Sequence, residues 1–181
     1  MDYMIVFDTS TLILLSKAEL LEIFLSDFKG KILMPGKVRE EILAGSKEGV
    51  PLIVKLINEK KIHVSKVKNT KAVMKLMEDF NIDEGEAEAL ILAIQEKAIM
   101  VATDDGNAIK ACKLLKMDFT TAITFLIRAF GKNLIGQDES LIKLQKLISM
   151  GRYDNKIIED ATKRIKEGER DVEKNIKHTN G

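Results

Sequence analysis

Short apolar runs alternate with segments of helical spacing along most of the chain. Residues 3–7 (YMIVF) form a run of strand length without polar alternation, which is typical of a strand covered on both faces, as in a parallel sheet. Four more runs predict further strands, at residues 32–34, 62–67, 99–102 and 119–121. Strands that alternate with helices in this way predict an α/β domain with a parallel sheet.

Apolar residues recur at helical spacing between these strands. The first predicted helix begins at Thr9 or Ser10, either of which could cap it, and continues to the break at Lys29 and Gly30. The other helices predicted before residue 135 cover residues 36–43, 52–60, 71–80, 82–95, 108–115 and 122–130.

The chain beyond Gly136 predicts helices only. One amphipathic helix is marked by Leu141, Leu144, Leu147 and Ile148. A second is expected over residues 155–177, with inner-side positions that run from Ile157 to Val172. We therefore expect an α/β domain over residues 1–135 and a helical extension over residues 136–181, packed on the domain or continuing it.

Composition restricts the chemistry that the chain can carry. The 29 Lys and Arg against 28 Asp and Glu give a net charge of +1, so the summed charge selects no partner. Cys112 is the single cysteine, which excludes a disulfide framework, a redox pair and a thiolate-rich zinc site. His63 and His178 are far apart in sequence. Any catalytic or metal site is therefore expected to use oxygen ligands.

No segment of the sequence resembles a membrane anchor. The composition is 45% hydrophobic and 31% charged, and the longest uncharged stretches are well short of the roughly 18 residues that a spanning helix needs. The N-terminus lacks a basic leader, and Asp8 interrupts its apolar run. We expect a cytoplasmic protein without a membrane partner.

Carboxylates follow two of the predicted strands directly. Asp8 comes after the first strand, and Asp104 and Asp105 come after the strand at residues 99–102. Taken singly, these acids are also explained as a helix cap and a turn. Ligands bind outside the carboxyl ends of parallel strands, so their joint placement predicts a site at one edge of the sheet.

Two predicted helices add further acids to this edge. Glu41 lies on the border of the inward side of the helix at residues 36–43. Asp83 and Glu86 have the spacing of a capping box, which gives Glu86 a structural role. Glu88 lies deeper in the same helix among apolar residues, so we expect Glu88 to belong to the site.

Converging carboxylates repel one another unless a cation lies between them. A site made only of oxygen ligands favours Mg²⁺ or Mn²⁺, and such ions typically act on phosphate esters. Basic residues on helices that begin near the same edge are candidates to contact a nucleic-acid backbone: Lys37, Arg39, Lys110, Lys113 and Lys116. The residues therefore suggest phosphodiester hydrolysis.

Four segments in this order resemble the PIN-domain family of ribonucleases, in particular its short toxin-type prokaryotic members, known as VapC-like. They are VFDTSTLI with Asp8, PGKVREEIL with Glu41, DEGEAEALILA with Glu88, and VATDDGNAIKAC with Asp104 and Asp105. The resemblance covers roughly residues 4–121. It implies a three-layer α/β/α sandwich with a mostly parallel sheet, and endonucleolytic cleavage of RNA that depends on Mg²⁺ or Mn²⁺.

The resemblance also implies roles for individual residues. The catalytic acids would be Asp8, Glu41, Glu88 and Asp105, and the metal ligands would be Asp8, Glu88 and either or both of Asp104 and Asp105. The hydroxyl groups that orient these acids would belong to Thr9, Ser10 and Thr103. Many members have Asp where this chain has Glu88. Beyond RNA, the implied partners are a small antitoxin protein and a second copy of the chain.

Four alternatives to a toxin-type nuclease differ in the residues or partners that they require. A haloacid-dehalogenase-like phosphatase needs a second Asp two residues after the first, where this chain has Ser10, and a receiver domain needs a lysine beside its acids. A maturation nuclease for ribosomal or transfer RNA would act without an antitoxin. The strongest rival is a PIN fold that keeps its acids but serves as a binding or scaffold module in RNA processing.

Overall fold

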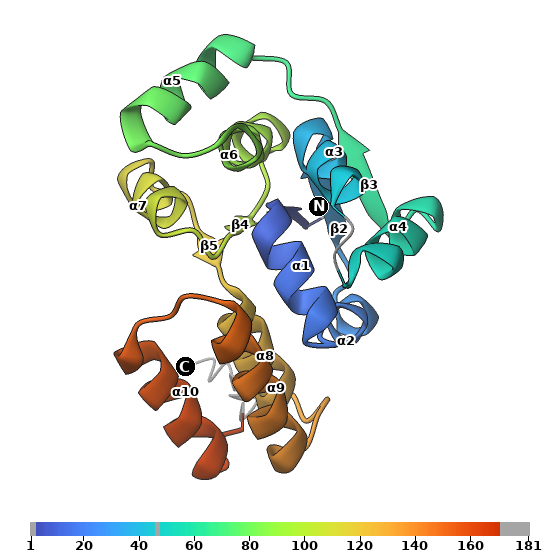
Figure 1. Cartoon of the computed structure of the whole chain (residues 1–181), viewed down its shortest axis with the longest axis vertical. Coiled ribbons are helices and arrows are strands. Elements are labelled where there is room, and N and C mark those ends of the chain that lie inside the picture. Colours follow the sequence, from blue (N-terminus) through green and yellow to red (C-terminus); the bar gives the residue numbers. More distant parts are fainter. Residues whose placement is uncertain (1–2, 46–47, 171–181) are drawn as a thin grey trace, which may run out of the picture.

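The computed structural model describes residues 3–45 and 48–170 of the chain. Its sheet has five parallel strands, which are β1 (Met4–Phe7), β2 (Lys31–Pro35), β3 (Ile62–Ser65), β4 (Met100–Ala102) and β5 (Phe119–Thr120). The strand order is β3-β2-β1-β4-β5, so β1 lies at the centre between β2 and β4 (Figure 1). Val6 of β1 is in register with Leu33 on one side and with Val101 on the other.

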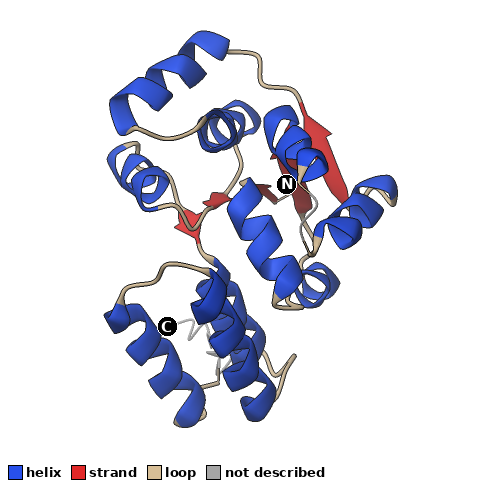
Figure 2. Cartoon of the chain, in the orientation of Figure 1, coloured by secondary structure: helices blue, strands red, loops and turns tan. Residues whose placement is uncertain are grey.

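Helices cover both faces of this sheet (Figure 2). One face carries α1 (Thr9–Lys17), α2 (Leu21–Asp27), α3 (Gly36–Ala44), α4 (Val50–Asn58) and α8 (Ala122–Gly131). The other face carries α5 (Thr70–Phe80), α6 (Glu84–Glu96) and α7 (Gly106–Leu114). The predicted three-layer sandwich is confirmed, and its sheet is parallel throughout the described residues.

Side chains of β1 divide the hydrophobic core between the two faces. Ile5 and Phe7 point to one core and Val6 points to the other, because successive residues of a strand face opposite sides. The Phe7 ring stacks on Phe125 of α8 with 5.6 Å between centroids, and Phe24 of α2 meets Phe125 edge-on at 4.6 Å. These contacts attach α2 and α8 to the central strand.

The first predicted helix is wrong in its length, because the structure divides it into α1 and α2. Glu19 between them has a φ of 56°, in the left-handed region that interrupts a helix. The buried amine of Lys143 donates to the carbonyls of Ala18 and Glu19, at 3.2 Å each. A distant side chain thus satisfies backbone groups that a continuous helix would have paired itself.

The helices beyond Gly136 pack on α8 and join the core that contains Phe7. They are α9 (Gln137–Met150) and α10 (Asn155–Lys166), and their fully buried side chains include Leu144, Leu147 and Ile165. The predicted second helix is too long, since α10 ends at Lys166 and the chain turns at Gly168 with a φ of 69°. Val172 lies outside the described residues.

No helix in the described part of the chain combines the length and the apolar character that crossing a membrane requires.

Candidate active site

The segments that follow β1 and β4 diverge toward opposite faces of the sheet. β1 leads into α1, whereas the neighbouring strand β4 leads into α7. Open parallel sheets bind ligands at such a switch point, outside the carboxyl ends of the strands. Asp8 lies in the first segment, and its backbone N–H donates to the carbonyl of Ala102 at 3.1 Å. Asp104 and Asp105 follow Ala102 directly, so the acids at the two strand ends meet at one edge.

Asp8 is buried at this edge, with 1% of its surface exposed. Its Oδ1 caps α1, since it accepts from the backbone N–H of Thr11 at 2.9 Å and from the Ser10 hydroxyl at 3.1 Å. Its Oδ2 is buried without a hydrogen-bond partner among the described residues. Burial raises the pKa of Asp8 to about 6, and the Asp104 carboxylate adds to the rise. One oxygen of Asp8 is therefore held, and the other lacks the contact that a buried polar atom normally has.

Asp104 is occupied by hydrogen bonds from three separate elements. It accepts from the Thr11 hydroxyl at 2.7 Å, from the backbone N–H of Ala122 at 3.1 Å, and from the Tyr153 hydroxyl at 3.1 Å. Burial raises the pKa of Asp104, and burial together with the Asp104 charge raises the pKa of Tyr153, which keeps this hydroxyl a donor. Asp104 thus connects α1, the start of α8 and the α9–α10 loop. No pattern in the sequence marks Thr11 or Tyr153 as partners of an acid.

Asp105 caps the helix on the other face. Its Oδ1 accepts from the backbone N–H groups of Asn107 at 2.9 Å and Ala108 at 2.8 Å. The hydroxyl of buried Thr103 accepts from the backbone N–H of Asp105 at 3.3 Å. Asp105 is therefore oriented from two sides and retains a second carboxylate oxygen. Of the two neighbouring aspartates, Asp105 has fewer structural contacts than Asp104.

Glu86 takes part in the cap of α6, as expected, and also reaches the acidic edge. The capping box is confirmed, with Asp83 Oδ1 accepting from the Glu86 N–H at 2.8 Å and Glu86 Oε2 accepting from the Asp83 N–H at 3.0 Å. Burial raises the pKa of Glu86 to about 7, with additional contributions from the charges of Asp83, Asp105 and Asp8. Glu86 therefore shares an electrostatic environment with the strand-end acids.

Glu88 lies elsewhere on α6. Its Oε2 accepts from the backbone N–H of Lys37 at the start of α3, at 3.1 Å. Glu84, one turn before Glu88, forms a salt bridge with the Lys37 amine at 3.1 Å. Residues four apart, such as Glu84 and Glu88, share a helix face. Glu86 is two residues from each of them and therefore lies about 200° around the helix from both. The structure therefore brings Glu86, rather than the predicted Glu88, to the strand-end acids.

Glu41 lies beside the acidic edge, between α1 and α6. Its carboxylate accepts a hydrogen bond from the Thr9 hydroxyl, and its pKa is raised mainly by burial and further by the charge of Asp83. A Cβ atom at Gly85 would lie 2.7 Å from Glu41 Oε1, so the close approach of Glu41 to α6 requires glycine at this position. Thr9 and Ser10 thus each contact a carboxylate, Glu41 and Asp8 respectively.

A cleft of about 410 Å³ opens at three of these acids, Glu86, Asp104 and Asp105, whereas Asp8 and Glu41 do not line it. Its lining combines carboxylates, two basic residues and apolar side chains: Ser10, Ile13, Leu14, Lys17, Glu86, Asp104, Asp105, Met150, Gly151 and Arg152. The α9–α10 loop therefore contributes a wall of the cleft, although it lies outside the motifs that the sequence singled out.

The cations predicted to contact RNA do not line this cleft. The amine of Lys37 is neutralised by Glu84, and it also lies 3.8 Å from Glu40. Arg39 is exposed on α3. Two more are exposed on α7, Lys110 and Lys113, and the Lys113 amine lies 5.9 Å from the centroid of the Phe119 ring.

The side chains at the cleft have the chemistry of a site for a hard divalent cation. The carboxylates there offer only oxygen ligands, and within the described residues the buried Oδ2 of Asp8 nearby has no hydrogen-bond donor. Within residues 3–45 and 48–170, no three His, Cys, Asp or Glu side chains already lie close enough together to hold a metal ion. Three of these carboxylates could share one ion only if they drew closer to one another, whereas one or two of them could bind an ion that keeps several water ligands.

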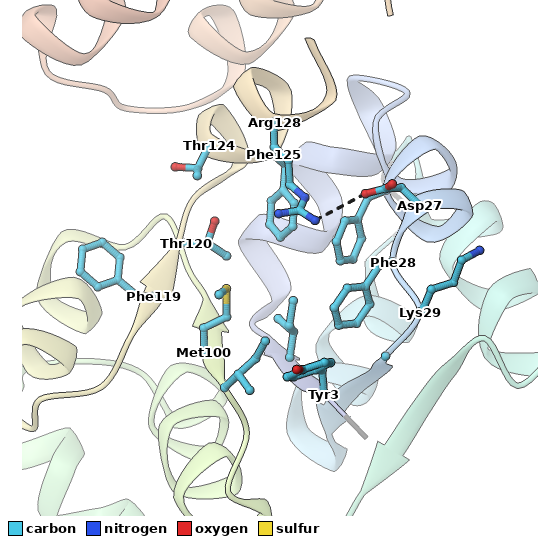
Figure 3. Close-up of a pocket in the computed structure, with 14 residues that line it drawn as sticks. Tyr3, Asp27, Phe28, Lys29, Met100, Phe119, Thr120, Thr124, Phe125 and Arg128 are labelled. Atoms are coloured by element: carbon cyan, nitrogen blue, oxygen red, sulfur yellow. Dashed lines mark ion pairs between the residues drawn. The ribbon is translucent and has the colours of Figure 1, made fainter. Parts of the chain in front are cut away.

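A second cavity, of about 510 Å³, is lined by residues of α2 and α8 and of the strands β1, β4 and β5 (Figure 3). Its walls are mostly aromatic and aliphatic, and include Tyr3, Phe28, Met100, Phe119 and Phe125. Asp27, its one acidic lining residue, is paired with Arg128 at 3.5 Å and with Lys132 at 2.7 Å. Among its described lining residues this cavity has no group of carboxylates, in contrast to the cleft that Glu86, Asp104 and Asp105 line.

Comparison with protein families matches residues 4–167 to the family described as PIN domain. The matched residues include the strand-end acids, Glu41, Glu86 and the α9–α10 loop. A search of curated proteins found no match.

Proposed function

Because this chain belongs to the PIN-domain family, whose members are in general nucleases, we propose that it is an endoribonuclease that hydrolyses RNA phosphodiester bonds with Mg²⁺ or Mn²⁺. One observation carries the proposal. The buried Asp8 has an oxygen without a hydrogen-bond partner in the part of the chain that the structure describes, at the sheet edge where Asp105 and Glu86 also lie. A cation would provide the missing contact and offset the repulsion between these acids.

Asp8, Glu86 and Asp105 are the residues that would hold the ion, with Glu41 beside them. When bound, such an ion activates water and stabilises negative charge on the leaving oxygen. The chain's own groups orient the acids: Ser10 and the Thr11 N–H hold one oxygen of Asp8, and the start of α7 holds one oxygen of Asp105. Each of these two aspartates therefore has one fixed oxygen, which limits its rotation.

The electrostatics of the cleft support the same proposal. The pKa of Asp8 is raised to about 6 and that of Glu86 to about 7, in part because each carboxylate lies in the field of other acids. Acids with raised pKa values are partly protonated near neutral pH, and a divalent cation favours their charged forms. Keeping these acids together without a cation costs stability, which favours the nuclease over a scaffold module.

The direct test is cleavage of a panel of end-labelled RNAs with Mg²⁺ or Mn²⁺, comparing the wild type with Asp8→Asn. The amide oxygen of Asn can still accept from the Thr11 N–H, so we expect the variant to fold. We expect its cleavage rate to fall at least about 100-fold, because the carboxylate charge is lost. EDTA should abolish wild-type cleavage, and DNA strands of the same sequence test the preference for RNA.

Asp160→Asn is the matched control, since Asp160 is exposed on α10 and does not line the cleft. Equal cleavage by the wild type and Asp8→Asn would refute the assignment. Thermal melts separate the scaffold alternative: Mn²⁺ should raise the melting temperature of the wild type but not of Asp8→Asn. A wild-type protein that binds RNA, ignores Mn²⁺ and cleaves nothing would be a binding module.

The biological role depends on the RNA and on a partner. A toxin would be inhibited by a small antitoxin that covers the cleft, whereas a maturation nuclease would act on ribosomal or transfer RNA precursors without one. Co-expression with the product of a neighbouring short open reading frame separates these roles, since only an antitoxin would abolish cleavage.

A further inference from the structure

Two basic side chains line the acidic cleft. Lys17 is the last residue of α1, and Arg152 lies in the α9–α10 loop. Within the described residues, neither side chain forms a salt bridge with a carboxylate. Their charges are therefore not neutralised by any described carboxylate, in contrast to that of Lys37, which is paired with Glu84.

The loop that carries Arg152 is fixed against the site. The Gly151 N–H donates to the Leu147 carbonyl at 2.8 Å, and the Tyr153 hydroxyl donates to Asp104 at 3.1 Å. A Cβ atom at Gly151 would lie 2.5 Å from the Tyr153 ring, so glycine at this position allows the ring to fold back. Arg152 is thus held between two anchored residues and exposed at the wall of the cleft.

RNA that approaches this cleft meets the negative charges of Glu86, Asp104 and Asp105. A divalent cation would offset only part of this charge, so phosphates on either side of the reacting bond need positive charge from the protein. Lys17 and Arg152 line the same cleft as these acids. A guanidinium group can also donate two parallel hydrogen bonds to one phosphate.

We propose that Lys17 and Arg152 bind the phosphates of single-stranded RNA that flank the bond held at the acids. This assignment rests on the proposed function and names how the substrate is positioned. It replaces the α3 and α7 cations expected from the sequence with one residue at the end of α1 and one in the α9–α10 loop.

The test measures binding of a fluorescently labelled single-stranded RNA by anisotropy, at several KCl concentrations with Mg²⁺ present. All binding measurements use the Asp8→Asn background, so that the RNA is not cleaved. We expect Lys17→Gln and Arg152→Gln each to weaken binding about five- to tenfold. Each substitution should reduce the slope of log K against log salt by about 0.7, because one phosphate contact is lost. In the cleavage assay, KM should rise by a similar factor with little change in kcat.

Lys71→Gln is the matched control, because Lys71 is exposed on α5 and does not line the cleft. Unchanged salt slopes in both cleft variants would overturn the assignment. A salt slope lowered only by Lys110→Gln would mean that the lysines predicted on α7 contact the RNA instead. If RNA binds with the expected slopes but is not cleaved, the nuclease proposal fails while the phosphate contacts stand. If RNA is cleaved but both variants bind and cleave it as the wild type does, the nuclease proposal stands and the phosphate contacts of Lys17 and Arg152 fail.

Discussion

Two glutamates on α6, Glu86 and Glu88, stand two positions apart and therefore point in different directions. The sequence favoured Glu88 because Glu86 already had a capping role. In the structure one oxygen of Glu86 serves the cap while its carboxylate also lies near Asp8 and Asp105. The pattern of apolar residues could not show which glutamate faces the site. Leu90 and Leu92, one turn after Glu86 and Glu88 respectively, are both fully buried.

This difference predicts the order of two substitutions. Glu86→Gln should weaken Mn²⁺ binding at least about tenfold, since it removes a charge from the cleft, whereas Glu88→Gln should have a much smaller effect. The amide oxygen of Gln at position 86 can still accept from the Asp83 N–H, so the cap is retained. Calorimetric titration with Mn²⁺ measures both affinities. A larger loss in Glu88→Gln would show that Glu88 is the ligand.

The choice between Asp104 and Asp105 also depended on residues distant in sequence. Both follow β4, and their spacing from the strand does not show which of them belongs to the site. Asp104 is occupied by Thr11, Ala122 and Tyr153, and these partners come together only in the folded chain. The strand-end position of Asp8 was predictable, because it needs only the end of one apolar run.

At the scale of elements, hydrophobic periodicity located most helices of the described chain, and long-range contacts decided where some of them end. The apolar positions from Leu12 to Leu25 continue across the break between α1 and α2. Lys143 stabilises that break from α9, by donating to the carbonyls of Ala18 and Glu19. A single-sequence pattern contains no information about a donor more than 120 residues away.

Lys143→Met should therefore destabilise the fold through the α1–α2 turn. Methionine preserves most of the buried chain length but leaves two carbonyls without their donor, so the free energy of unfolding should fall by about 2 kcal/mol. Urea denaturation measures the change. Lys146→Met is the control, because the exposed Lys146–Glu19 salt bridge should contribute less than about 1 kcal/mol. Equal losses in the two variants would mean that the buried hydrogen bonds do not stabilise the turn.

At the scale of the whole molecule, the alternation of strands and helices predicted the parallel sheet, and the sheet predicted where the acids gather. The strand order placed β1 beside β4, which brought Asp8 next to the segment after Ala102. The wall contributed by the α9–α10 loop was not predictable, because no acid or motif marks Gly151 or Arg152. Its position follows from the packing of α9 and α10 on α8.

The raised pKa values predict how stability depends on pH. Asp8 and Glu86 bind protons more tightly in the folded chain than in the unfolded chain, with folded pKa values of about 6 and about 7. Without metal, preferential protonation of these two groups in the folded chain stabilises it fully below about pH 4. This stabilisation is lost as the pH rises to about 7. For buried Asp8 the loss amounts to about 3 kcal/mol. Carboxylates with lowered pKa values, such as Asp27, act in the opposite direction and at lower pH.

Urea unfolding in EDTA between pH 5 and pH 7.5 measures this dependence. We expect the free energy of unfolding to fall with pH in the wild type and to fall less in Asp8→Asn, which cannot ionise. Mn²⁺ at pH 7.5 should restore stability to the wild type only. A wild-type curve that rises over this range would contradict the electrostatic account of the cleft.

The hydrogen bond from Tyr153 to Asp104 has a practical consequence for protein engineering. A chain trimmed at residue 135 would keep every described strand and every acid at the sheet edge. It would also keep all four sequence segments that resemble the PIN-domain family. It would nevertheless lose the phenol that steadies Asp104 and the arginine beside it. Any attempt to shorten or graft this domain should therefore retain the chain through α10.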